Sequence, residues 1–162
     1  MLATGRLTIS TLYNTPHDFE NSLLGMEFVG FNTHNERIMG VCSDGGITNV
    51  ILADKYLKWV IPDKWTMEDA ATVPIVYSTC YYALYIKGKM KKGDKVLIHS
   101  GTGGIGQAAI YLALSEGCEV FTTVGNVEKR QFIINTFPSI PEDNIGNSRD
   151  TSFQQMIMQR IR

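Results

Sequence analysis

Two patterns of hydrophobic and polar positions divide the 162-residue chain. Up to residue 62, short apolar segments alternate with polar turns such as NTHNE and SDGG, as is typical of short strands. These segments are LLGMEFVGF, RIMGVC, TNVILA and LKWVIP. From Thr66 the pattern changes, because the spacing of Thr66 and Asp69 is that of a capping box and predicts a mostly buried helical region over 66–86. Pro74 should kink or restart this helix, since proline removes an amide donor.

Strands and helices alternate in the rest of the chain. The segment KVLIHS (95–100) is typical of a strand buried on both faces, and CEVFTTV (118–124) and NIGN (144–147) predict two further strands. Helices are expected after the first strand, over 127–137 and over 151–161, with Asn126 as the cap of the second and Pro138 at its end. This alternation predicts an α/β fold with a parallel sheet wound by helices.

The first of these helices has one apolar face. Its positions recur at i, i+3, i+4 and i+7, which is the spacing of a helix that packs against a sheet. They are Ile105, Ala108, Ala109 and Leu112. Gly117 is expected to end the helix, because glycine readily adopts the left-handed conformation that follows a helix.

A glycine-rich turn, HSGTGGIGQAA (99–109), joins the first strand to this helix. Glycines leave backbone N–H groups uncovered where a helix begins, and such a place attracts phosphate. A P-loop would need Lys and then Ser or Thr after the last glycine, where this chain has Gln107 and Ala108. With a strand before it and a helix after it, the turn predicts a dinucleotide site, although glycine turns also arise for conformational reasons alone.

The segment FTTVGN (121–126) indicates which dinucleotide is bound. In NAD-binding folds an acidic residue in this zone accepts hydrogen bonds from the ribose, and none is present here. Lys129 and Arg130 follow within one turn of Gly125, where cations would hold a 2′-phosphate. NADPH is therefore expected, and we predict that Lys129→Ala weakens NADPH and spares NADH. Arg130 is equally well interpreted as part of a solvated helix face.

Net charge, hydropathy and cysteine spacing indicate which partners, location and thiol state to expect. The 15 Lys and Arg nearly cancel the 16 Asp and Glu, so neither nucleic acid nor a membrane surface is an expected partner. No apolar run reaches a bilayer-spanning length, and residues 1–10 lack a hydrophobic signal core, so a cytoplasmic location is expected. Cys42, Cys80 and Cys118 are widely spaced and are expected to be reduced core thiols.

Five blocks of the chain resemble a known family. LLGMEFVG, AATVPIVYSTCYYAL, LIHSGTGGIGQAA, VFTTVGNVEKR and NSRDTSF look like successive blocks of the enoyl reductase domain of animal fatty acid synthase, in the medium-chain dehydrogenase/reductase superfamily. The resemblance implies a partial GroES-like substrate domain with connecting helices at 1–88. The first half of an NADP-binding, doubly wound Rossmann domain would follow at 89–162.

The resemblance also implies a reaction and its partners. The reaction would be NADPH-dependent reduction of the 2,3 double bond of an enoyl thioester on acyl carrier protein, in fatty acid biosynthesis. The rest of a multienzyme polypeptide would be the partner. Only about three of the six strand–helix units of a full Rossmann domain are expected, so we expect the 162 residues alone not to turn over.

Candidate cofactor contacts follow from the glycine turn and from the resemblance together. They are Thr79, Ser100, Gly101, Thr102, Gly103, Gly104, Ile105, Gly106, Thr123, Gly125, Lys129, Arg130, Ser148 and Arg149. Thr79 would face the nicotinamide side, while Tyr77, Tyr81 and Tyr82 on the same helix are more simply interpreted as packing residues. Ser148 and Arg149 lie where relatives contact the adenosine phosphate, but an exposed helix start would account for them too.

No catalytic residue and no metal site are identified. Related zinc enzymes have a GHE motif, and here Met26 stands in the place of its histidine, which removes a ligand suited to zinc. His17, His34 and His99 show no ligand spacing, and Glu27 is interpreted as a structural or solvated residue. Two other functions remain open: a free-standing NADPH-dependent quinone or enone reductase, and a protein that binds NADPH without catalysis.

Overall fold

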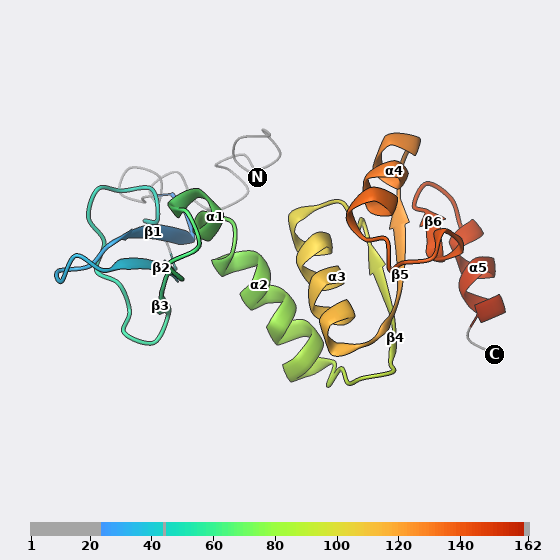
Figure 1. Ribbon diagram of the computed structural model, residues 1–162, viewed down its shortest axis with the longest axis horizontal. Helices are drawn as coiled ribbons and strands as arrows, with labels where there is room; N and C mark the ends of the chain where they lie inside the picture. Colours follow the sequence, from blue (N-terminus) through green and yellow to red (C-terminus); the bar gives the residue numbers. More distant parts are fainter. Residues whose placement is uncertain (1–23, 44, 161–162) are drawn as a thin grey trace, which may run out of the picture. The chain divides into compact units, whose positions relative to one another are not determined.

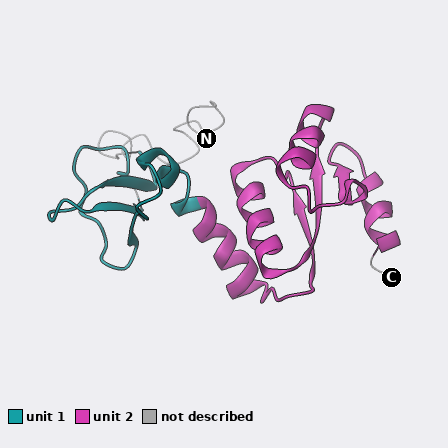
Figure 2. Ribbon diagram, viewed as in Figure 1, with its two compact units in different colours: residues 1–75 teal, residues 76–162 magenta. Residues whose placement is uncertain are grey.

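The computed structural model describes residues 24–43 and 45–160, which form two compact units (Figures 1 and 2). Unit 1 is 1–75 and unit 2 is 76–162. The division falls before the domain boundary expected after Gly88, so most of the helix that begins at Pro74 belongs to unit 2. The expectations for residues 1–10 and for His17 lie outside the described residues.

Unit 1 contains an antiparallel sheet in the order β1-β2-β3. Its strands are β1 (Glu27–Phe31), β2 (Arg37–Val41) and β3 (Lys58–Val60), with Met39 opposite Val29 on one side and Trp59 on the other. Three of the four predicted strands are confirmed. The fourth, TNVILA, forms no strand, and its Val50 and Leu52 are 85% and 100% exposed. Local apolar character was not sufficient there, because a strand also needs a paired neighbour.

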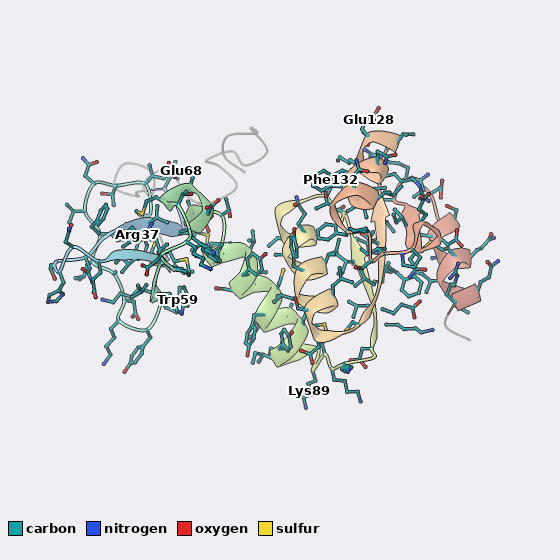
Figure 3. The ribbon with its side chains drawn as sticks, viewed as in Figure 1. Arg37, Trp59, Glu68, Lys89, Glu128 and Phe132 are labelled. Atoms are coloured by element: carbon teal, nitrogen blue, oxygen red, sulfur yellow. The ribbon has the colours of Figure 1, made fainter. Side chains whose placement is uncertain are left out.

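Arg37 fixes the segment that follows this sheet. Its guanidinium donates hydrogen bonds to the carbonyl oxygens of Trp65, Pro62 and Asp63, at 2.7, 3.1 and 3.2 Å. Arg37 is labelled in Figure 3, where it lies among the strands of unit 1. These bonds hold the turn that leads into the first helix.

The predicted helix start and restart are both confirmed. In α1 (Met67–Ala71), Thr66 Oγ1 accepts the Asp69 N–H and the Asp69 carboxylate accepts the Thr66 N–H, each at 3.0 Å. Helix α2 (Pro74–Tyr81) begins at Pro74. It continues as a π-helical segment, η4 (Tyr82–Lys87).

The predicted burial of this helical region is wrong. Tyr81, Tyr82 and Ile86 are each 54% exposed, whereas Cys80 is buried and Val76 packs against the core of unit 2. Only one side of the region therefore has a packing partner among the described residues. An apolar composition does not show which helix face is covered, and this accounts for the error.

Unit 2 is built on a parallel sheet in the order β4-β5-β6 (Figure 1). Its elements are β4 (Lys95–His99), α3 (Gly104–Glu116), β5 (Glu119–Val124), α4 (Val127–Thr136), η5 (Glu142–Asn144), β6 (Ile145–Asn147) and α5 (Ser152–Arg160). Asn126 caps α4 by accepting the Lys129 N–H, and Gly117 ends α3 at φ +83°. The predicted α/β fold class is confirmed.

The core of unit 2 lies between the sheet and helices α2, α3 and α4. Its buried members include Ile98, Ile110, Ala113, Val120 and Ile133. Two details differ from expectation. Strand β4 is not buried on both faces, since Leu97 is 38% exposed. Among the described residues, β4 also pairs on one edge only, with β5. Ile105, in the first turn of α3, is 40% exposed.

Helices long and apolar enough to cross a bilayer are absent from the part of the chain that the structure describes.

Candidate cofactor-binding site

The glycine-rich turn lies between the end of β4 and the start of α3 (Figure 1). Ser100 has φ +58°, a left-handed conformation that is uncommon for a residue with a side chain. Its carbonyl oxygen accepts the Gly103 N–H at 3.0 Å, which closes the turn. The Gly101 N–H donates to the Thr123 carbonyl at 3.2 Å. The turn is thereby fixed to the carboxyl end of β5.

Two of the four glycines are required by packing. A Cβ on Gly101 would lie 2.2 Å from Thr122 Oγ1, and a Cβ on Gly106 would lie 2.4 Å from the Ser100 carbonyl oxygen. Both distances are far below van der Waals contact. Gly101 and Gly106 therefore allow the turn, β5 and α3 to approach one another closely, as expected of helix–strand packing at a dinucleotide turn.

The other two glycines have room for a Cβ at ordinary van der Waals contact. The nearest atoms to a Cβ on Gly103 or Gly104 are 3.5 Å away, at the Ser100 carbonyl oxygen and at Val76 Cγ1. A Cβ there would be sterically tolerated within the protein. The structure thus separates the four glycines into two that pack and two that leave the turn accessible.

The first turn of α3 begins with backbone N–H groups that have no acceptor within the helix. Gly103 is the N-cap, and the first bond within the helix runs from the Gln107 N–H to the Gly103 carbonyl at 2.8 Å. The N–H groups of Gly104, Ile105 and Gly106 precede it, so the helix itself provides them with no acceptor. Gln107 Nε2 also donates to the Thr102 carbonyl at 2.9 Å. This fixed set of donors is suited to a phosphate group.

Helix α2 supports the start of α3 from the side. Val76 lies against Gly104, and Cys80 Sγ donates to the Ile105 carbonyl at 3.3 Å. Thr79 precedes Cys80 and is exposed. Its role as a cofactor contact stays a prediction.

The tyrosines of this region take part in packing. Tyr81 stacks on Tyr85 with ring centroids 4.9 Å apart, and Tyr77 packs against the core of unit 2. Burial raises the pKa of the Tyr77 phenol, and the neighbouring Tyr111 and Cys80 raise it further. The phenol of Tyr77 is therefore protonated at neutral pH.

A separate cavity of about 250 Å³ lies at the carboxyl ends of β5 and β6. It is lined by Val124, Gly125, Asn126, Val127, Arg130, Gly146, Asn147 and Arg149. The guanidinium of Arg149 lies over Gly125, where a Cβ would be 2.9 Å from Nε. The Asn147 side chain accepts the Arg149 N–H at 3.0 Å and so orients this residue. With two arginines in its wall, the cavity is suited to an anionic group.

Of the remaining candidate cofactor contacts Arg130, Lys129 and Ser148, only Arg130 lines this cavity. Arg130 lines it, but its guanidinium also donates to the carbonyl oxygens of Ile145 and Glu142, so it has a structural role as well. Lys129 is exposed and does not line the cavity. Ser148 also lies outside its wall, and its N–H donates to the Val124 carbonyl at 2.9 Å.

Thr123 is placed differently from the expectation of a direct cofactor contact. It is 0% exposed, and its hydroxyl is 2.9 Å from His99 Nδ1. Its side chain therefore joins β5 to β4, which counts against contact with a ligand through the hydroxyl. The preference of threonine for strands was the signal that favoured a structural role.

Sequence reasoning missed the asparagines of the cavity. Asn126 and Asn147 line it, and both also fix local backbone through their side-chain oxygens. Asn126 lies two residues after the end of β5, and Asn147 is the last residue of β6. Since ligands bind outside the carboxyl ends of parallel strands, position alone would have indicated both residues.

The residues of the GME stretch fit a structural role. Met26 is 54% exposed, and Glu27 Oε2 accepts the Ile75 N–H at 3.0 Å. In the described part of the chain, no group of three or more His, Cys, Asp and Glu side chains is arranged to hold a metal ion. The absence of a metal in the protein stays a prediction.

Comparison with curated proteins finds reducing multienzymes. The chain is 37% identical over 163 residues to a highly reducing polyketide synthase of Penicillium soppii, which covers 98% of this chain and 6% of that protein. It is 46% identical over 99 residues to highly reducing polyketide synthase 1 of Aureobasidium melanogenum, covering 61% of this chain and 4% of that protein. The chain thus spans a small part of the length of these relatives. No protein-family model matches it.

Comparison with solved structures finds reductases. The CurK enoyl reductase is 28% identical with a TM-score of 0.77, over 94% of this chain and 47% of that one. The JamJ enoyl reductase is 29% identical with a TM-score of 0.73, over 88% of this chain and 44% of that one. A quinone oxidoreductase of Thermus thermophilus, also solved with NADPH, is 30% identical with a TM-score of 0.60, over 65% of this chain and 35% of that one.

The fold and the glycine turn define a partial medium-chain dehydrogenase/reductase fold with a dinucleotide-type turn. Within this superfamily, the chain matches part of an enoyl reductase. The resemblance to the animal fatty acid synthase type is corrected by these comparisons, because the curated relatives are fungal polyketide synthases. Blocks such as LIHSGTGGIGQAA serve the fold and the turn, and therefore do not distinguish the two kinds of multienzyme.

Proposed function

We propose that the chain is the cofactor-binding part of an NADPH-dependent enoyl reductase. Its substrate is an enoyl thioester on acyl carrier protein, and the reaction reduces the 2,3 double bond during assembly of an acyl or polyketide chain. The reductase acts within a multienzyme polypeptide. The relatives that cover nearly all of this chain, or carry the same fold, support this proposal.

One structural observation carries the proposal: the open turn and the arginine-lined cavity both lie at the carboxyl edge of one parallel sheet. Gly101 N–H joins the turn to the end of β5, and Gly125 directly follows the last residue of β5 in the cavity wall. NADPH carries a pyrophosphate at its centre and a 2′-phosphate on its adenosine ribose, and a dinucleotide binds across such an edge. A single phosphate ligand would not need both features.

The residues fit such a cofactor. The N–H groups of Gly104, Ile105 and Gly106 would bind the pyrophosphate, because no Cβ covers the turn at Gly103 or Gly104. Arg149 would bind a 2′-phosphate by a charge-assisted hydrogen bond. The nicotinamide, when bound, supplies the hydride. The role of the described residues is thus to bind and orient the cofactor.

The test is the natural gene product assayed with a trans-2-butenoyl thioester. The proposal expects NADPH oxidation that depends on the thioester, with the saturated thioester as the product by mass spectrometry. NADPH binding without turnover, on every enoyl thioester supplied, would contradict the proposal and favour a non-catalytic NADPH-binding protein.

A second candidate is a free-standing NADPH-dependent quinone or enone reductase. It is favoured by the 30% identity to the Thermus thermophilus quinone oxidoreductase. The same assay separates the two candidates, because a quinone reductase would reduce a small quinone much faster than the thioester.

A further inference from the structure

The segment that carries Arg149 is fixed to the end of β5. Asn147, the last residue of β6, lies opposite Val124, and the Ser148 N–H donates to the Val124 carbonyl at 2.9 Å. These bonds place the backbone up to Ser148. The direction in which the chain continues decides where the guanidinium of Arg149 lies, and it lies over Gly125 in the cavity wall.

The side-chain amide of Asn147 sets this direction. Its Oδ1 accepts the Arg149 N–H at 3.0 Å, and its Nδ2 donates to Asp150 Oδ2 at 2.7 Å. A carboxylate only accepts hydrogen bonds, so Asp150 binds the NH2 group of the amide and leaves the amide oxygen for the Arg149 N–H. Asp150 therefore determines which way the Asn147 amide faces.

Both carboxylate oxygens of Asp150 have partners. While Oδ2 accepts from Asn147, Oδ1 accepts the Ser152 N–H at 2.9 Å, where α5 begins. Hydrogen bonds from the hydroxyl and the N–H of Ser152 lower the pKa of Asp150, and the bond from Asn147 lowers it further, so the group is ionised at neutral pH. Among the described residues, no carboxylate forms an ion pair with Arg149. The charge of Arg149 is therefore left for an anion in the cavity.

We propose that Asp150 is a positioning residue for the 2′-phosphate of NADPH, acting through the Asn147 amide on Arg149. This inference rests on the proposed function. Asp150 orients the amide, the amide holds the Arg149 N–H, and the guanidinium lies in the cavity wall. Asp150 thereby contributes to the preference for NADPH over NADH, although it does not line the cavity itself.

The experiment measures the dissociation constants of NADPH and NADH by fluorescence titration of the natural gene product. Asp150→Ala frees the Asn147 amide, so we expect the dissociation constant of NADPH to rise about threefold to tenfold. The dissociation constant of NADH should stay within about twofold of wild type, because NADH has no 2′-phosphate. The ratio of the two constants is the readout, since a general loss of stability would affect both cofactors alike.

Asp143→Ala is the matched control. It also removes one exposed carboxylate beside α5, because Asp143 accepts a hydrogen bond from Arg160 in the last turn of that helix at 2.7 Å. Its carboxylate makes no contact with Asn147 or Arg149 among the described interactions. Both dissociation constants should therefore stay within about twofold of wild type in this variant.

Asp150→Asn separates geometry from charge. Its amide has one oxygen in place of two, so it cannot accept from both Asn147 and Ser152 with separate oxygens, and NADPH binding should weaken as in Asp150→Ala. If Asp150 acted only through its negative charge, both variants would instead bind NADPH more tightly. If Asp150→Ala does not fold, Asp150→Asn alone decides the question.

The outcomes separate the two claims. An unchanged ratio of the NADPH and NADH constants in the Asp150 variants, or tighter NADPH binding, would overturn the role of Asp150 and leave the proposed function standing. A wild-type protein that does not bind NADPH would overturn the proposed function and this inference with it.

Discussion

The guanidinium of Arg149 covers Gly125 so closely that a Cβ there would lie 2.9 Å from Nε and 3.2 Å from one terminal nitrogen. The two residues are 24 positions apart and meet because β5 and β6 are parallel neighbours that end at the same edge of the sheet. The guanidinium of Arg149 therefore lies in the cavity wall next to the carboxyl end of β5, and no acidic residue stands at that end of β5.

Arg149→Ala should weaken NADPH binding and leave NADH nearly unchanged. The loss of one charge-assisted contact to the 2′-phosphate is expected to cost about 1.5–3 kcal/mol. Titration of both cofactors measures it. Lys129→Ala is the matched control, since Lys129 is exposed outside the cavity wall, and its effect should be smaller. A larger effect at Lys129 would favour the original expectation from the sequence.

Gly125→Ala should also weaken NADPH binding, although it removes no contact. The added Cβ would displace the Arg149 guanidinium from its position over Gly125. In the double variant with Arg149→Ala, the effect of Gly125→Ala on NADPH should largely disappear, because the group that it displaces is gone. Additive losses of binding free energy would show that Gly125 acts in another way.

Gly106→Ala and Gly103→Ala should differ sharply in stability. A Cβ on Gly106 would clash with the backbone of Ser100 and Gly101, and we expect a loss of about 2–4 kcal/mol in the free energy of unfolding. Gly103 has φ −75° and room for a Cβ at 3.5 Å from its nearest neighbour, so alanine there should change stability by less than about 1 kcal/mol. Urea denaturation of both variants measures the difference, and equal losses would contradict the division of the glycines.

The capping box of α1 should make stability depend on pH. The backbone hydrogen bond from Thr66, and then its side-chain bond, lower the pKa of Asp69 from the ordinary value of 3.8. A lowered pKa in the folded state means that the contribution is present above the ordinary pKa and is lost as pH falls through the folded pKa. Wild type should therefore exceed Asp69→Asn in stability at neutral pH, with a difference that vanishes in acid. Melting curves across this range measure it, and a difference independent of pH would exclude ionised Asp69 as the cause.

The sequence predicted those features that depend on local chemistry. The Thr66 capping box, the restart at Pro74, the Asn126 cap and the left-handed Gly117 each arise from residues within one turn of the feature. Side-chain hydrogen bonds and fixed backbone angles act over this range, so residue type is sufficient to indicate them.

The features that the sequence did not predict depend on distant partners. Ser100 adopts φ +58° because the turn is fixed between β4 and β5, and nothing in its own side chain favours this angle. The resemblance named Arg149 as a candidate, but the sequence did not predict that Arg149 lines the cavity while Lys129 lies outside it, which follows from the pairing of β5 with β6. The exposed Val50 likewise reflects pairing, because its segment joins no strand in the described part of the chain. Each of these placements depends on residues far away in the sequence.

The most direct test of the central claim is a calorimetric titration of NADPH into wild-type protein and into Gly103→Val. Gly103 is the N-cap of α3, and a Cβ on it would meet its nearest neighbour, the Ser100 carbonyl oxygen, at 3.5 Å, which is ordinary van der Waals contact. We predict saturable binding of one NADPH per wild-type chain, and no measurable binding to Gly103→Val at a modestly lowered melting temperature. Equal affinity of the two proteins for NADPH would contradict the claim that this turn holds the dinucleotide.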